Sequence, residues 1–160
     1  MAAATGRARL VGVISDTHGL LRPEAIDALR GSELIVHAGD VGNADVLEAL
    51  RAIAPTIAVR GNVDTAPWAV VLPTTEVVEA DRVHLYVLHD LSTLDLDPKA
   101  AGFAAVIFGH SHRPSAEVRD DVLYLNPGSA GPRRFSLPIS VARLQVDGER
   151  VSCELVELRV

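Results

Sequence analysis

Seven side chains of the kinds that bind metal ions each follow a short apolar, β-branched run. They are Asp16, His18, Asp40, Asn62, His89, His110 and His112. Residues two apart in extended backbone point to the same side, so we expect Asp16 and His18 to converge on one point, and likewise His110 and His112. Functional groups in open α/β sheets gather beyond the carboxyl ends of the strands. The fold must therefore bring several strand ends together.

The first half of the chain alternates between buried-strand and helix patterns. We predict strands at 10–14, 33–37 and 56–59 and helices at 23–29 and 46–53. Pro23 suits the first turn of a helix, Asn43 or Asp45 can cap the second helix, and Pro55 stops it. Strand–helix–strand repeats of this kind indicate a parallel sheet with right-handed crossovers.

The second half has paired apolar runs separated by short polar turns. We predict three hairpins, at 76–88, 115–125 and 140–158. We also predict a short helix at 97–101 and one more buried strand at 104–108. Asp147-Gly148 is the strongest of the hairpin turn signals. We expect one mixed α/β domain over residues 1–160, in which two sheets pack together with helices outside.

Composition limits the partners and the compartment. The 160 residues are 48% hydrophobic and 22% charged, which is typical of a globular protein, and no apolar run is long enough for a membrane span. A net charge of −6 argues against broad nucleic-acid binding. The N-terminus lacks the apolar segment of a signal peptide, and Cys153 is the single cysteine. We therefore expect a cytoplasmic protein without an intrachain disulfide.

The seven candidate ligands offer carboxylate, imidazole and amide donors. This mixture suits Mn²⁺, Fe or Zn²⁺, with Ni²⁺ or Co²⁺ as alternatives. In a two-metal site one carboxylate must bridge ions about 3.5–4 Å apart, which then share a hydroxide. Asp40 is central in the order of ligands and is the candidate bridge.

Taken together, these motifs resemble the calcineurin-like metallophosphoesterase superfamily. They are Asp16-x-His18, Gly39-Asp40, Gly61-Asn62-x-Asp64, His89 and Gly109-His110-Ser111-His112. The short chain and Asn126-Pro127-Gly128-Ser129 are similar to its small bacterial and archaeal phosphodiesterase branch, over residues 10–158. The resemblance implies a four-layer α/β/β/α sandwich of two mixed β-sheets flanked by helices. It also implies two divalent ions, with Mn²⁺ the first candidate, and a homodimer.

The resemblance also implies roles for the candidate ligands. Asp16, His18, Asp40 and His112 would hold the first ion, and Asp40, Asn62, His89 and His110 the second. The expected activity is a metal-dependent phosphodiesterase in which the bridging hydroxide attacks a small phosphate ester in line, with Asp40, Asn62 and His89 as its catalytic residues. The alternatives are a phosphomonoesterase and a non-catalytic scaffold, since a eukaryotic retromer subunit shares this fold.

Two positions depart from the family pattern. Val63 stands where the superfamily has a histidine that assists the leaving group, which argues against a phosphomonoesterase, and Asp90 stands where it usually has glycine. Arg133, with Arg134 beside it, could clamp phosphate oxygens, although solvated surface arginines are the alternative. Three more polar residues are expected to lie outside the ligand set: a buried, hydrogen-bonded His37 that braces the metal loops, a supporting carboxylate or turn residue rather than a base at Asp64, and a surface His84.

Overall fold

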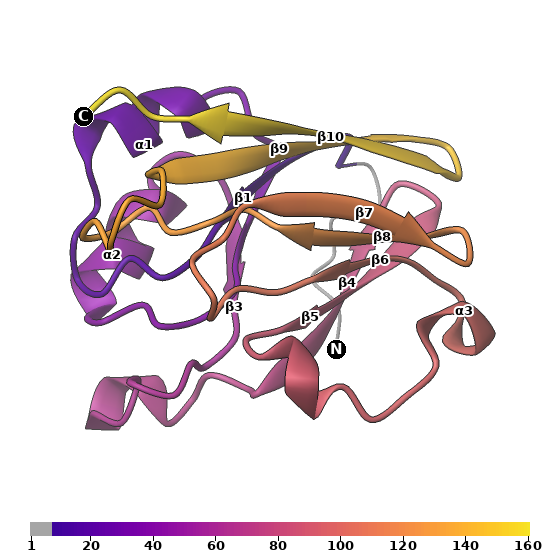
Figure 1. Cartoon of the computed structure of the whole chain (residues 1–160), viewed down its shortest axis with the longest axis horizontal. Coiled ribbons are helices and arrows are strands. Elements are labelled where there is room, and N and C mark those ends of the chain that lie inside the picture. The colour runs from indigo at the N-terminus through magenta and orange to yellow at the C-terminus, as the bar shows by residue number, and fades with distance from the viewer. Residues whose placement is uncertain (1–7) are drawn as a thin grey trace.

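Two five-stranded β-sheets pack face to face in the computed structural model, which describes residues 8–160 (Figure 1). The first sheet has the order β10-β9-β1-β2-β3, with bounds Arg150–Glu157, Ser140–Asp147, Leu10–Ile14, Leu34–His37 and Thr56–Ala58. The second has the order β4-β5-β6-β8-β7, with bounds Thr75–Ala80, Val83–Leu88, Phe103–Ile107, Val122–Asn126 and Ser115–Arg119. In the first sheet β9 runs antiparallel to the other four strands, and in the second sheet β4 and β7 run antiparallel to the other three, so both sheets are mixed.

Strand β5 shows how the apolar runs make the layers. Leu85 and Val87 point into the cluster between the two sheets, whereas Tyr86 and Leu88 pack on the outer side of the second sheet. An apolar run buries both faces of a strand in this way, because successive side chains point to opposite sides. Each fully buried aliphatic side chain contributes roughly 1.5–3 kcal/mol.

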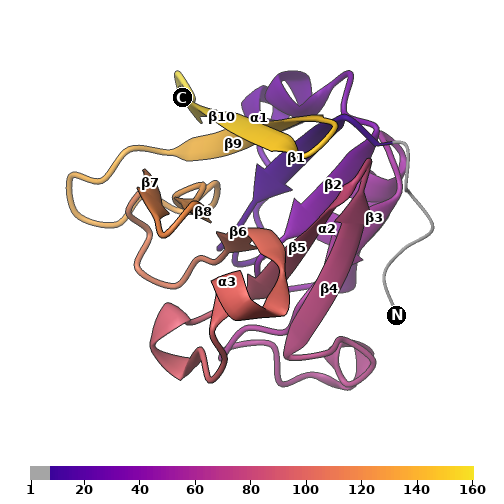
Figure 2. The same cartoon turned by 90° about the vertical axis from the view of Figure 1, so that its right-hand side faces the viewer.

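The helices cover the two outer faces. Helices α1 (Pro23–Leu29) and α2 (Ala44–Arg51) supply buried residues to the cluster outside the first sheet. Outside the second sheet lie α3 (Pro98–Ala101), seen in front of β5 and β6 in Figure 2, and the one-turn helix η2 (Leu91–Thr93). Another one-turn helix, η1 (Pro67–Ala69), follows β3. The predicted four-layer α/β/β/α sandwich is confirmed.

Local signals set most boundaries. Helix α1 begins at Pro23 as predicted, and Asn43 rather than Asp45 caps α2, with its Oδ1 accepting from the Val46 amide at 3.2 Å. Helix α2 ends at Arg51, two residues before the predicted end, because Ile53 forms a tighter turn to Leu50. The three hairpins and the buried strand β6 form within a residue of the predicted ranges. Within residues 8–160, no helix is long and apolar enough to cross a membrane.

Candidate metal centre

All seven predicted ligands lie just beyond strand ends at one edge of the sandwich. They follow β1 (Asp16, His18), β2 (Asp40), β3 (Asn62), β5 (His89) and β6 (His110, His112). The two sheets meet here through Asp16: its Oδ2 accepts from Ser15 Oγ at 2.7 Å and from the amide of His110 at 3.1 Å. A side chain from the first sheet therefore fixes the loop that carries the last two histidines.

The backbone that presents these ligands is not extended. Strands β1 and β6 end at Ile14 and Ile107, and five ligands adopt left-handed backbone with φ between 47° and 72°: Asp16, His18, Asp40, His110 and His112. Asp16 and His18 do converge as expected, with His18 Nε2 3.8 Å from Asp16 Oδ1, but the extended backbone given as the reason is wrong. Left-handed backbone costs a non-glycine residue about 1–2 kcal/mol and clusters at functional sites.

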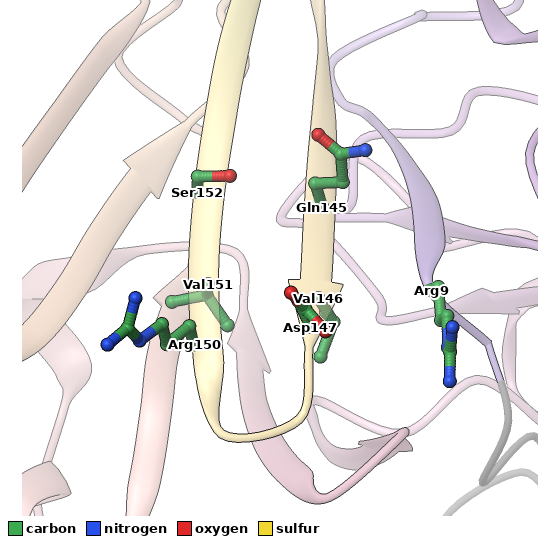
Figure 3. Close-up of a pocket in the computed structure, with 7 residues that line it drawn as sticks. All are labelled: Arg9, Gln145, Val146, Asp147, Arg150, Val151 and Ser152. Carbon is green, nitrogen blue, oxygen red and sulfur yellow. The ribbon is translucent and has the colours of Figure 1, made fainter.

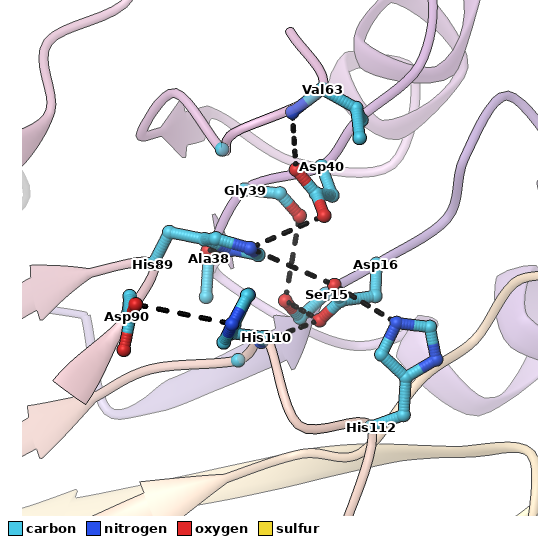
Figure 4. A network of polar contacts seen from close by, with 12 residues as sticks. Ser15, Asp16, Ala38, Gly39, Asp40, Val63, His89, Asp90, His110 and His112 are labelled. Carbon is cyan, nitrogen blue, oxygen red and sulfur yellow. Dashed lines mark hydrogen bonds and ion pairs between the residues drawn. The ribbon is translucent and has the colours of Figure 1, made fainter. Parts of the chain in front are cut away.

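Five ligands form two compact groups that share Asp16: Asp16, His18 and His112, and Asp16, Asp40 and His89. Figure 4 labels these residues except His18. Around Asp16 Oδ1, the Nε2 atoms of His112, His18 and His89 lie at 3.3, 3.8 and 3.9 Å. Asp40 Oδ2 lies 3.2 Å from His89 Nε2 and 3.7 Å from His18 Nε2. Both carboxylates thus face histidines of both groups.

The unsatisfied atoms of this cluster fit a cation. Asp16 Oδ1, His18 Nε2 and His89 Nε2 are buried and have no hydrogen-bond partner among the described residues. His89 donates Nδ1–H to the Ala38 carbonyl at 2.8 Å, which leaves the Nε2 lone pair turned toward the carboxylates. Buried polar atoms without partners are costly. Divalent ions bind to carboxylate oxygens and to histidine nitrogens, and the ligating histidine ring is commonly oriented by a hydrogen bond from its other nitrogen.

Both carboxyl groups are ionised at neutral pH. Burial would raise the pKa of Asp40, but the His89 imidazole 3.2 Å away and a hydrogen bond from the Val63 amide outweigh it and hold the pKa at about 2. Burial opposes ionisation of Asp16 too, yet His112 and Ser15 keep its pKa below the ordinary value. For His89, burial lowers the pKa, but the facing carboxylates of Asp40 and Asp16 raise it overall.

Asn62 and His110 lie on the exposed side of the cluster. With His89 they line a cavity of about 290 Å³. His110 packs edge-on against His89, with ring centroids 5.2 Å apart, and its Nε2 lies 3.9 Å from Asp90 Oδ2. His112 instead faces Asp16. The prediction that His110 and His112 point to one place is therefore wrong.

Two polar residues brace the ligand loops, as predicted. The Asp64 carboxylate accepts from the amides of Val41, Gly42 and Gly61 at 3.1, 3.0 and 2.9 Å, and so joins the loops after β2 and β3. His37 is fully buried between Thr17 Oγ1 and the Gly39 amide, at 3.0 and 3.1 Å. By contrast, the His84 side chain is 51% exposed, beside Glu79, as expected for a surface residue.

Burial of His37 makes folding depend on pH. Burial lowers its pKa from 6.5 to about 4, so below pH 6.5 the unfolded chain binds a proton that the folded protein does not. The contribution of neutral, buried His37 to the free energy of unfolding is complete above pH 6.5 and is lost as the pH falls toward 4. Between pH 7 and 5 we expect a loss of about 2 kcal/mol in the free energy of unfolding from this residue.

Urea unfolding of metal-free protein at the two pH values measures this loss. His37→Gln cannot titrate and should remove that part of the difference, whereas the exposed control His84→Gln should keep it. An equal pH difference in His37→Gln and the parent protein would contradict the assignment.

Arg60 lines the cavity beside the ligand cluster, and the predicted Arg133 is not among the residues that line it. Arg133 is exposed, donates to the Leu137 carbonyl at 3.2 Å and does not line the cavity beside the ligands. Arg60, which sequence reasoning missed, lines it and is half-buried. The signal was its place directly before the Gly61-Asn62 motif. A larger cavity, about 560 Å³ and lined by Arg9, Gln145 and Arg150 among others, contains none of the candidate ligands (Figure 3).

Comparison with known proteins identifies the family. The family model of the calcineurin-like phosphoesterase superfamily domain matches residues 10–149. A probable metallophosphoesterase of Methanothermobacter thermautotrophicus is 36% identical over 159 residues, covering 92% of this chain and 91% of that protein. Phosphodiesterase YfcE of Escherichia coli is 31% identical over 163 residues, covering 83% of this chain and 85% of that protein.

The fold comparison agrees. The solved structure of an archaeal phosphodiesterase is 25% identical, with a TM-score of 0.76, and covers 92% of this chain and 99% of that chain. The family match begins at the first residue of β1 and includes all seven candidate ligands. This chain belongs to the calcineurin-like phosphoesterase superfamily.

Proposed function

We propose that this protein is a phosphodiesterase that uses two divalent ions, Mn²⁺ first among them, to hydrolyse small phosphate esters. The observation that carries the proposal is the cluster of Asp16, His18, Asp40, His89 and His112, in which Asp16 Oδ1, His18 Nε2 and His89 Nε2 are buried and lack hydrogen-bond partners in the described part of the chain. Family membership supports it, because calcineurin-like phosphoesterases use divalent metals.

The residues divide into two sets of ligands. Asp16, His18 and His112 would hold one ion, His89, Asn62 and His110 the other, and Asp40 would contribute to both. When bound, the ions would supply Lewis-acid stabilisation of the phosphoryl oxygens and a hydroxide nucleophile at neutral pH. Asp40 Oδ2 faces histidines of both sets, at 3.2 and 3.7 Å, which supports it as the bridge. Its Oδ1 is fixed by the Val63 amide at 3.0 Å.

Residue 63 favours a diesterase over a monoesterase. The Val63 side chain is 45% exposed and has no proton to donate to a departing alkoxide. A placed general acid is typically worth about 10²–10⁴-fold for a poor leaving group. Without one at this position, esters with acidic leaving groups are the favoured substrates. The name of YfcE, a phosphodiesterase, agrees with this choice.

A metal-depletion assay with two esters tests the proposal. Metal-free protein should hydrolyse neither bis(4-nitrophenyl) phosphate nor 4-nitrophenyl phosphate, and Mn²⁺ should restore activity with at least about tenfold higher kcat/KM for the diester. Full activity without metal would refute the metal requirement. Two bound ions without hydrolysis of either ester would favour the scaffold, and a preference for the monoester would favour the phosphomonoesterase.

Three further proposals concern the state of the protein. The single half-buried cysteine supports a reducing, cytoplasmic location. One apolar cluster draws on strands of both sheets, which supports residues 1–160 acting as one domain. Sedimentation velocity decides between a monomer and the homodimer proposed from the family resemblance.

A further inference from the structure

The cavity beside the metal-ligand cluster has one basic and one acidic wall residue. It measures about 290 Å³ and is lined by Arg60 and Asp90 together with Asn62, His110, Thr74 and Thr93. Because Asn62 and His110 are candidate ligands, an ester bound at the centre has this cavity directly beside it. The residues that distinguish this cavity from the metal centre are therefore Arg60 and Asp90.

Hydrogen bonds hold the backbone at Arg60, but its guanidinium has no charged partner among residues 8–160. Its backbone amide donates to the Pro73 carbonyl at 2.8 Å, and the next residue, Gly61, donates to Asp64 at 2.9 Å. Arg60 is half-buried, and its guanidinium has no hydrogen bond or ion pair within residues 8–160, whereas those of Arg22 and Arg143 donate to backbone carbonyls. Guanidinium groups bind phosphate oxygens through paired N–H donors. Arg60 is thus available for the anion of a substrate.

Asp90 has one oxygen in use and one free for a ligand. Its Oδ1 accepts from the amide and hydroxyl of Ser92 at 3.0 and 2.8 Å, which fixes the side chain at the start of η2. The Oδ2 atom lies 3.9 Å from His110 Nε2, which is beyond hydrogen-bond distance. The carboxylate side chain is 36% exposed. It therefore presents a fixed negative charge to whatever enters the cavity.

We infer that this cavity binds the non-leaving substituent of a phosphodiester. Arg60 contacts the phosphate, and Asp90 selects cationic or uncharged substituents over anionic ones. The inference rests on the proposed phosphodiesterase function and names its substrate class. An arginine and a carboxylate that line one cavity beside the centre complement an ester that has a negative phosphate and an alcohol with a positive charge, as in an aminoalcohol. A second negative charge on the substituent would meet Asp90.

Three synthetic esters with one leaving group test the role of Asp90. Each is a 4-nitrophenyl phosphodiester, and the second substituent is choline, its uncharged isostere 3,3-dimethylbutyl, or 3-carboxypropyl. The Mn²⁺-loaded parent protein should prefer them in that order, by roughly three- to tenfold per unit of charge for charges about 6 Å apart in a solvated site with an effective dielectric constant of about 40–80. Asp90→Asn keeps an oxygen for Ser92 and should bring both ratios close to one.

A matched control removes a charge from outside the cavity. Asp95→Asn alters an exposed carboxylate that does not line the cavity, and should keep the parent ratios. Ratios between esters cancel any loss of metal or turnover that affects all three substrates equally. Unchanged ratios in Asp90→Asn, or the same shift in Asp95→Asn, would overturn the role of Asp90.

Arg60 should act on all three esters alike. Arg60→Gln is expected to raise KM about tenfold or more for each, and to weaken competitive inhibition by inorganic phosphate by a similar factor, since charge-assisted hydrogen bonds are lost. Arg60→Lys should recover part of the loss. The exposed control Arg51→Gln, whose guanidinium pairs with Glu48, should leave KM unchanged. Parent-like phosphate inhibition in Arg60→Gln would overturn its role.

The proposed function and the inferred substrate class fail in different ways. If the Mn²⁺-loaded parent hydrolyses none of the three esters, the proposed function fails. If it hydrolyses them with equal kcat/KM, or prefers the carboxypropyl ester, the phosphodiesterase stands and the inferred substrate class is wrong.

Discussion

Asp40→Asn should lower kcat for diester hydrolysis by roughly 10³-fold or more, the largest loss expected from any single change in this protein. In the proposed centre Asp40 would contribute to both ions, and metal stabilisation of transition-state charge is worth several kcal/mol, with about 1.36 kcal/mol for each factor of ten. Asparagine keeps an oxygen for the Val63 amide, which lies 3.0 Å from Asp40 Oδ1, so the loop should survive. The variant should retain fewer than two ions per chain.

Comparison with Asp16→Asn decides which carboxylate bridges. Asp16 Oδ1 also lies within 3.9 Å of histidines from both groups, whereas its Oδ2 is occupied by Ser15 and the His110 amide. With the exposed Asp45→Asn as a control for charge, metal content and kcat are measured at saturating Mn²⁺. If Asp40→Asn kept two ions and normal turnover while Asp16→Asn lost both, the bridge would be Asp16.

Gly61→Ala should disrupt the centre without removing any ligand. A Cβ on Gly61 would overlap the Asp40 amide nitrogen and Oδ1, and the Gly61 amide itself donates to Asp64 at 2.9 Å. The clash is with backbone, so the loops after β2 and β3 must separate. Overpacking of this kind typically costs about 1–3 kcal/mol, occasionally more. Mn²⁺ affinity should fall together with stability, because Asp40 and Asn62 lie on these two loops.

Gly102→Ala is the matched control for Gly61→Ala. Gly102 has φ +84°, and no atom lies within 4 Å of the position that a Cβ would take, so alanine meets only backbone strain. That strain costs about 1–2 kcal/mol. Urea unfolding and Mn²⁺ titration should show lower stability in both variants but weaker metal binding only in Gly61→Ala. Parent-like Mn²⁺ affinity in Gly61→Ala would show that metal binding does not depend on the close approach of Gly61 to Asp40.

The two sheets and the helices outside them could be predicted from the sequence, because hydrophobic periodicity and turn residues are local signals. Runs such as 83–88 are apolar at every position but one, as a strand buried on both faces must be, and Asp147-Gly148 ends a strand where the hairpin β9–β10 turns. Placement of ligand-type residues after such runs also predicted that Asp16 and His89 would meet. Their donor atoms, from different sheets, lie 3.9 Å apart.

The details of the site could not be predicted, because they depend on contacts between segments that are distant in the sequence. Left-handed backbone at Asp16 and His110 follows from packing of the two loops, which no local pattern encodes. The different directions of His110 and His112 have the same origin. Arg133 and Arg60 could not be ranked from sequence, because only the fold puts Arg60 beside Asn62 in a cavity.

The most direct test of the two-metal centre is a crystal structure of the Mn²⁺-soaked protein, with anomalous difference maps to locate the metal. We expect two peaks about 3.5–4 Å apart. One would lie among Asp16, His18 and His112 and the other beside His89, Asn62 and His110, with Asp40 between them. A single peak, or manganese bound away from these seven residues, would contradict a two-metal centre.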